Sequence, residues 1–345
     1  MKGYVNQMKK FSFKRKVQEP AVKTPTLDSF PDFTKKEIFT QGELINNLLA
    51  RYIKAGKINF DYLKIKADKI KRIYIVGSGI DYSCAIFAAY NFEVLLDVIS
   101  TPVSNGEFLC SNPILDKNTL IILLGEDERI VKKLTDTGAR FVKIVDYSDD
   151  KSAITLNYKT LGSFQSAVYS MKLTVLSLLA LYFGEKNQII TSLYVKIATQ
   201  MISGLEQKIK HILAYEFIIN EICDNMDFDN ILFTGTNVDY AISIYAARIL
   251  SCIANKEIAA VPMCELNPYQ RNCKSVCAFA SNIDFYNLFD INLNYQLKII
   301  SNSVNTTDDN TIFYDESIPL LNPILSAVVI QMISYRKLKN HPLQE

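Results

Sequence analysis

The chain has 345 residues, of which 49% are apolar, so it is long enough to form two ordinary hydrophobic cores. Its 38 basic and 36 acidic side chains leave a formal net charge of only +2, which argues against nucleic-acid or membrane binding. The seven cysteines are irregularly spaced and there are only two histidines, so we expect reduced structural thiols, no metal site and no cofactor.

Residues 1–32 are expected to form a flexible basic extension, because lysines and an arginine cluster between Lys9 and Lys16 and prolines follow. Contact of this arm with an anionic partner is the alternative. The N-terminus has no apolar segment of the secretory type. The longest apolar run, Leu173–Phe183, is too short to span a membrane and predicts a buried helix. A cytoplasmic location is therefore expected.

Helical spacing of apolar residues begins near Thr34, and a strand–turn–helix pattern follows from Lys71. The strand is predicted at Ile73–Val76, the turn at Gly77–Gly79 and the helix at Tyr82–Leu96. A second strand near Val98 is expected to lead into a loop over residues 103–107.

The remaining patterns continue this alternation of strands and helices. They predict strands at Thr119–Leu124, Phe141–Val145, Asn230–Thr234 and Leu297–Ser301, and helices at Arg129–Thr137, Ser163–Phe183, Ile189–Asn225 and Leu325–Leu338. Such alternation is typical of an α/β fold with parallel doubly wound sheets that bind ligands at the carboxyl ends of their strands. We expect two tandem domains of this kind, over residues 33–215 and 216–345.

An internal repeat supports two domains. Residues 73–107 and 231–265 align without a gap, and their identical positions are Ile73, Gly77, Asp81, Tyr82, Ile86, Ala88, Ala89, Val103 and Glu107, paired with Ile231, Gly235, Asp239, Tyr240, Ile244, Ala246, Ala247, Val261 and Glu265. These positions fall on a strand end, a turn and one helix face. A duplicated α/β domain usually places its site where the copies or subunits meet.

Gly77-Ser78-Gly79 follows a strand and opens a helix, so its backbone N–H groups and the Ser78 hydroxyl could bind a phosphate. A tight turn that merely needs glycine conformations is the alternative. The counterpart, Gly235-Thr236-Asn237, keeps a hydroxyl and ends in Asn, which tolerates positive φ. The turn at Gly125–Arg129 holds three carboxylates, so we interpret it as an ordinary acidic helix N-terminus and not as an anion site.

At these motifs the chain resembles the sugar isomerase (SIS) domain family, specifically the isomerase half of glucosamine-6-phosphate synthases. The resemblance covers roughly residues 33–342. It is carried by Lys36-Glu37-Ile38-Phe39-Thr40-Gln41, Ile75-Val76-Gly77-Ser78-Gly79, Leu173-Thr174-Val175-Leu176, Glu265-Leu266, Asn322-Pro323-Ile324 and Gln331-Met332-Ile333-Ser334-Tyr335.

The resemblance implies two tandem SIS domains, a sugar phosphate as ligand and a homodimer. It implies phosphosugar-binding positions at Gly77, Ser78, Gly79, Ser163 and Gln165. The apolar helices over residues 170–183 and 325–335 are then expected to pack against a second subunit. No nucleic acid, membrane, metal or cofactor is expected.

Several positions that the family uses for catalysis are substituted. The resemblance places the proton-shuttling glutamate at Cys252 and the ring-opening histidine at Pro268. The family's Ser-Gln-Ser-Gly-Glu-Thr phosphate loop is shortened to the acidic turn at Gly125, and its hydroxyl-rich loop after the fourth strand survives in part over residues 162–166. Each general acid or base contributes roughly 100- to 10,000-fold to a rate, so several losses would remove most of the family's rate enhancement. Cys252 and Glu265 remain weak catalytic candidates. Their alternatives are a buried structural thiol and a carboxylate that accepts backbone N–H bonds at a turn.

Three functions therefore remain open. The first is a phosphosugar-binding protein, for hexose 6-phosphates, with weakened or lost catalysis, which we favour. The second is an active phosphosugar aldose–ketose isomerase or deglycase with a variant site. The third is a dimeric scaffold that binds no sugar phosphate.

Overall fold

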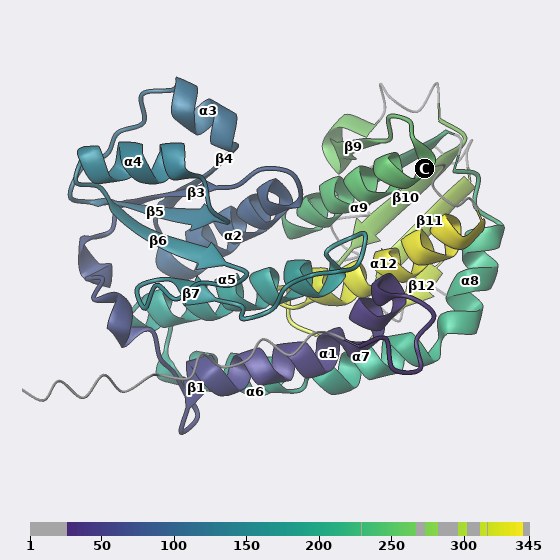
Figure 1. The fold of residues 1–345 in the computed structure, drawn as a ribbon, viewed down its shortest axis with the longest axis horizontal. Coiled ribbons are helices and arrows are strands. Elements are labelled where there is room, and N and C mark those ends of the chain that lie inside the picture. The colour runs from purple at the N-terminus through teal and green to yellow at the C-terminus, as the bar shows by residue number, and fades with distance from the viewer. Residues whose placement is uncertain are drawn as a thin grey trace, which may run out of the picture.

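Two parallel five-stranded sheets, each flanked by helices, make up the fold (Figure 1). The computed structural model describes residues 26–228, 230–266, 273–281, 296–301, 311–315 and 317–340. The first sheet has the order β4 (Ile99–Val103), β3 (Arg72–Val76), β5 (Thr119–Leu124), β6 (Arg140–Val145), β7 (Ile154–Thr155). The second has the order β9 (Ala259–Pro262), β8 (Ile231–Gly235), β10 (Ser275–Ala280), β11 (Gln296–Ser301), β12 (Thr311–Phe313). The predicted α/β class with parallel sheets is confirmed.

The helices cover both faces of these sheets and connect them. They are α1 (Phe33–Tyr52), α2 (Ile80–Leu96), α3 (Asn105–Cys110), α4 (Glu128–Asp136), α5 (Ser166–Lys186), α6 (Ser192–Ser203), α7 (Leu205–Ala214), α8 (Glu216–Asp224), α9 (Val238–Ala254) and α12 (Asn322–Asn340). A hairpin of β1 (Ile53–Lys54) and β2 (Lys57–Ile58) and the short helices η1 (Asp61–Leu63), η2 (Ala67–Lys69) and η3 (Met263–Glu265) complete the described elements. Helices α2 and α9 pack against each other between the sheets (Figure 1).

Several predicted boundaries were wrong, among them the start of the closing helix, which begins at Asn322 and not at Leu325. The expected loop at residues 103–107 contains the start of α3, because the Ser104 hydroxyl accepts a bond from the Glu107 N–H and caps a helix there. Helix α5 begins at Ser166 instead of Ser163, since Gln165 adopts a left-handed conformation. The helical stretch 189–225 is divided into α6, α7 and α8 by turns at Gly204 and Tyr215.

Helices α2 and α9 have matching ends. Gly79 and Asn237 precede them with φ of 62° and 51°, and Asp97 and Asn255 terminate them in the left-handed region. The tolerance of Asn for positive φ, predicted from the sequence, is confirmed at Asn237. Short polar side chains therefore take the place of glycine at three of these four ends.

The first glycine of each turn is required for close approach of strand and helix. A Cβ added at Gly77 would lie 2.9 Å from both the carbonyl oxygen and the Cβ of Asp81, and one at Gly235 would lie 2.7 Å from the carbonyl oxygen of Asp239. Any side chain at these positions would push the first helical turn away from the strand.

Gly77→Ala is therefore expected to lower the free energy of unfolding by about 1–3 kcal/mol, the usual cost of overpacking. Gly106→Ala is the matched control, because an added Cβ there meets nothing within 4 Å. Urea denaturation measures both. Equal stabilities for the two variants would contradict this explanation of Gly77.

One continuous core spans both halves of the chain. It includes Ile75 and Ile122 of the first sheet and Phe233 and Phe279 of the second, together with the inner faces of the helices between them. Residues 166–184 of α5 and 322–335 of α12 are all buried. The expectation that these two helices pack against a second subunit was wrong, because their faces are occupied within the same chain. Helix α5 is long and apolar enough to cross a membrane, but it is wholly enclosed in the fold.

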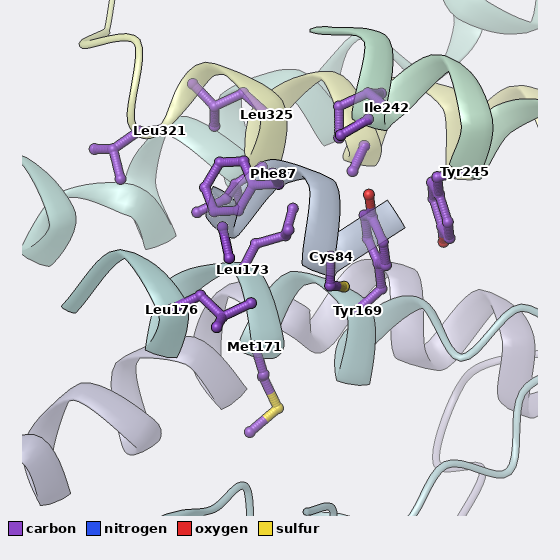
Figure 2. Close-up of a cluster of buried hydrophobic side chains, with 14 of the residues drawn as sticks. Cys84, Phe87, Tyr169, Met171, Leu173, Leu176, Ile242, Tyr245, Leu321 and Leu325 are labelled. Atoms are coloured by element: carbon purple, nitrogen blue, oxygen red, sulfur yellow. The ribbon is translucent and has the colours of Figure 1, made fainter. Parts of the chain in front are cut away.

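At the centre of this core, Tyr169 of α5 stacks on Tyr245 of α9 with ring centroids 3.7 Å apart (Figure 2). The Tyr169 hydroxyl bonds the Ser83 hydroxyl at 2.6 Å, and the Gln331 amide donates to the Tyr245 hydroxyl at 3.2 Å. Gln331 also accepts a bond of 2.8 Å from Gln41 of α1. Buried polar groups need such partners, so this network fixes how the helices of the two halves meet.

Candidate functional site

The turn Gly77–Gly79 lies at the carboxyl end of β3, where the amino terminus of α2 begins. Ser78 and Gly79 are exposed. The Ser78 hydroxyl accepts a hydrogen bond of 3.1 Å from the backbone N–H of Asn105. In this bond the hydroxyl oxygen is the acceptor, and within the described residues the Ser78 O–H donates to no group. It could therefore donate to a phosphate oxygen, which is an acceptor.

The acidic turn after β5 sits beside this edge. Asp127 caps α4 by accepting from the Arg129 N–H at 3.1 Å, and it forms an ion pair of 3.0 Å with the Arg129 guanidinium. The hydrogen bond from Arg129 lowers the pKa of the Asp127 carboxyl. The interpretation of this turn as an ordinary helix N-terminus is confirmed. Asp127 also accepts a 3.4 Å bond from the Asn105 amide, which ties it to the Ser78 turn.

The other predicted binding residues, Ser163 and Gln165, are exposed in the loop that leads into α5. Glu37 of α1 holds this loop. Its Oε1 atom accepts bonds from the Thr160 hydroxyl at 2.7 Å, the Leu161 N–H at 2.7 Å and the Gly162 N–H at 2.8 Å. Glu37 is only 2% exposed, so its carboxylate is a buried charge stabilised by these donors.

Ser163 itself is held by α1 as well. Its backbone N–H donates to the Thr34 hydroxyl at 3.0 Å. Glu37 belongs to the motif that begins the SIS resemblance, but no role was predicted for it. The only local signal was a carboxylate among the apolar positions of α1.

Lys172 of α5 joins this loop region to the turn of α2. It is 3% exposed, and its Nζ atom lies 2.8 Å from Asp81 Oδ1 and 3.3 Å from Asp146 Oδ1. Burial disfavours the charge on Lys172, but the carboxylates of Asp81 and Asp146 outweigh that effect and raise the pKa of its ammonium group. Asp81 follows the Gly77–Gly79 turn and Asp146 follows β6, so three segments meet at one edge. This ion-pair cluster was not predicted from the sequence. The one feature that could have indicated it is a lysine, Lys172, within an otherwise apolar helix.

Cys252 lies on α9, where it was expected to be a buried thiol. That expectation was wrong, because the side chain is exposed. Four residues before it on the same helix face, the Arg248 guanidinium lies 5.6 Å from the centre of the Tyr82 ring, in the first turn of α2. The second half therefore contributes Arg248, and one helical turn further Cys252, toward the carboxyl edge of the first sheet.

Glu265 lies elsewhere. It is in η3 after β9, at the carboxyl edge of the second sheet, where α9 begins. Since Cys252 is near the other end of α9, roughly 20 Å of helix separates the two catalytic candidates. Glu265 and its repeat partner Glu107 are exposed. The chain that follows Glu265, residues 267–272, lies outside the described residues, so the expected role of its carboxylate as an acceptor of backbone N–H bonds stays a prediction. Pro268 lies outside the described residues.

The second sheet has a different polar group at the equivalent edge. Asp239, the repeat partner of Asp81, is 3% exposed and accepts bonds from the Ser281 N–H at 2.8 Å and from the Ser281 hydroxyl. Burial raises the pKa of the Asp239 carboxyl to about 6, although the bonds from Ser281 act against that rise. The first copy thus pairs its aspartate with a lysine, whereas Asp239 forms no ion pair within the part of the chain that the structure describes.

This pKa implies a pH dependence of stability. Because the folded-state pKa of Asp239 is above its ordinary value, the associated stability is fully present below about pH 4 and is lost as pH rises through 6. The loss is expected to be about 3 kcal/mol. Asp239→Asn mimics the neutral form, so it should remove this loss of stability between pH 4 and 7. Asp149→Asn, at an exposed position, should leave the loss unchanged. Urea midpoints between pH 4 and 7 measure this, and parallel curves for wild type and Asp239→Asn would refute it.

The cysteines follow no common pattern. All seven are reduced thiols: Cys84, Cys223 and Cys277 are buried, Cys273 is intermediate, and Cys110, Cys252 and Cys264 are exposed. The expectation of reduced thiols agrees with this, but burial holds for only part of the set.

Comparisons with known proteins point to one group. No protein-family model matches the chain. A glutamine–fructose-6-phosphate aminotransferase (isomerizing) from Clostridium acetobutylicum is 24% identical over 339 residues, which cover 89% of this chain and 56% of that relative. Its counterpart from Clostridium tetani is 25% identical over 233 residues, covering 62% and 38%. The chain thus spans about half the length of these relatives or less.

Solved structures agree. The C-terminal domain of glucosamine-fructose-6-phosphate aminotransferase from Francisella tularensis matches with a TM-score of 0.83 and 18% identity, covering 93% of this chain and 100% of that domain. A glucosamine-6-phosphate deaminase from Thermotoga maritima matches with a TM-score of 0.65 and 15% identity, covering 91% and 96%. The resemblance that the sequence motifs indicated is confirmed.

Proposed function

We propose that this chain, which has the SIS fold of these phosphosugar proteins, binds a hexose 6-phosphate at the carboxyl edge of its first sheet. The observation that carries this proposal is the exposure of Ser78 and Gly79 at the start of α2, where the Ser78 hydroxyl accepts a bond from Asn105 and donates to no group within the described residues. Ser163 and Gln165 would contact the same ligand from the loop before α5. Arg248, over the ring of Tyr82 in the first turn of α2, would supply a cation to this edge.

We further propose that catalysis is weakened or lost. An exposed cysteine stands where the family has its proton-shuttling glutamate, and Glu265 lies near the opposite end of α9. Neither group is placed to share a proton with the other across one bound sugar. An active isomerase or deglycase with a variant site is the second candidate, and it would use Cys252 or Glu265 as its base. A scaffold that binds no sugar phosphate is the third.

The test is ligand-induced stabilisation combined with a turnover assay. Fructose 6-phosphate or glucosamine 6-phosphate should raise Tm without interconversion. Ser78→Asp keeps an acceptor for Asn105 but adds a negative charge, so it should abolish the shift, whereas Ser192→Asp, on exposed α6, should not. Turnover at ordinary enzyme rates would exclude the non-catalytic proposal. No shift with either sugar phosphate would favour the scaffold.

We propose that the two halves arose by duplication, that the domain division falls near Tyr215, and that the protein is a cytoplasmic homodimer. The common strand order of the two sheets and the matching ends of α2 and α9 support duplication. For the dimer, several large apolar side chains of the first half are exposed; they are Val94, Ile99, Ile189, Leu193 and Ile197. A monomeric mass by light scattering would contradict the dimer.

A further inference from the structure

A basic hollow lies at the amino-terminal edge of the first sheet, away from the proposed sugar-phosphate site. Its volume is about 600 Å³, and it is lined by Lys66, Asp68, Lys69, Lys71, Lys117, Asn118 and Arg140. Lys71 precedes β3, Asn118 precedes β5 and Arg140 opens β6. These strands are parallel neighbours, so the hollow is at the opposite end of the sheet from Gly77.

The charges in the basic hollow are not balanced. It gathers five cations against one carboxylate, whereas the chain as a whole has 38 basic and 36 acidic side chains. Asp68 is paired with Lys69 at 3.2 Å. All five cations are exposed, and within the described residues Lys66, Lys71 and Arg140 form no ion pair.

Other surface lysines of the chain do have carboxylate partners, for example Lys143 with Asp150 at 2.7 Å. The carboxylate next to Lys117 is Asp116, and it already bonds the Thr119 hydroxyl at 2.8 Å and faces Arg72 at 3.9 Å. The hollow therefore has a positive electrostatic potential that attracts anions, and the repulsion among its cations lowers the stability of the fold.

We propose that the basic hollow binds a soluble small molecule that carries several phosphate groups. Its volume is that of a small-molecule site. Lys71 and Arg140 belong to strands two positions apart, so they are separated by about 10 Å. A single phosphate would contact only some of the five cations in the hollow, whereas a chain of phosphates can contact several of them, Arg140 through two parallel hydrogen bonds and the lysines as point charges. A nucleic acid needs a longer basic track, which a net charge of +2 does not provide.

The test uses inorganic tripolyphosphate in calorimetric titrations of the full chain. The variant Lys71→Glu/Arg140→Glu should bind it at least tenfold more weakly than wild type. Lys132→Glu/Lys196→Glu, with the same change of net charge at two other exposed lysines, should bind within twofold of wild type. Lys66→Ala/Lys117→Ala gives a second, milder variant, with an expected loss of several-fold. Orthophosphate should bind at least tenfold more weakly than tripolyphosphate.

Three results would overturn the proposal: no binding by wild type, equal losses in the hollow and control variants, or a short single-stranded RNA that binds more tightly and displaces tripolyphosphate. The proposal is independent of the sugar-phosphate site. The Tm shift with fructose 6-phosphate should be unchanged in the hollow variants, so failure of one proposal leaves the other intact.

Discussion

Glu37→Ala is expected to lower the free energy of unfolding by about 3–5 kcal/mol, the usual result of breaking a buried charged network. The substitution leaves the Thr160 hydroxyl and the N–H groups of Leu161 and Gly162 without their acceptor. Each unsatisfied donor costs roughly 1–3 kcal/mol unless water reaches it, so partial relaxation of the loop is included in this range. Urea denaturation at neutral pH measures the change.

Glu43→Ala on the same helix is the control, because that side chain is exposed and should cost less than about 1 kcal/mol. Glu37→Gln keeps an acceptor oxygen and should fall between the two. If Glu37→Ala is as stable as Glu43→Ala, the carboxylate does not hold the loop that carries Ser163. The ligand-induced Tm shift should decrease in Glu37→Ala in proportion to the disorder of that loop.

Lys172→Met is expected to lower the free energy of unfolding by about 3–5 kcal/mol. The substitution leaves Asp81 and Asp146 without the cation that lies between them. Asp81 is mostly enclosed, with 15% of its side chain exposed, so solvent screens it only in part. Chemical denaturation again gives the value. Adding Asp81→Asn to Lys172→Met removes one of the unpaired charges and should recover part of the lost stability.

Lys186→Met on the same helix is the matched control. Lys186 is 52% exposed and pairs with Asp61 at 3.1 Å, so its loss should cost less than about 1 kcal/mol. A Lys172→Met variant no less stable than Lys186→Met would show that the buried cluster contributes nothing net. No recovery in the double variant would show instead that the lost packing of the lysine stem matters more than the charge.

Much of the scaffold is predictable from the sequence because its signals are local. The run Thr119–Leu124 is a strand with the predicted bounds. Gly138, predicted to stop the next helix, follows α4 with a positive φ of 64°. Strands β7 and β12 have two and three residues, too few to show an alternating pattern. Strand β10 was missed because small and sulfur-containing residues, as in Ala278 and Cys277, carry little strand preference.

The polar groups of the site are not predictable in the same way. Glu37 and its donors are more than a hundred positions apart in sequence, and Lys172 is 91 positions from Asp81. No local pattern links such residues; only the packing of α1, α2 and α5 brings them together. The glycine turns were predicted because their conformational requirements concern only a few consecutive residues. Glu37 and Lys172 instead bind groups that are far from them in the sequence.

The stacked Tyr169 and Tyr245 rings connect the two halves thermodynamically as well as structurally. Because both rings lie in one continuous core, opening either half would expose the aromatic surface of the other. We therefore expect local opening of one sheet to cost a large share of the free energy of global unfolding. Any binding energy gained at the carboxyl edge of the first sheet is consequently shared with strands β8–β12, which the ligand does not touch.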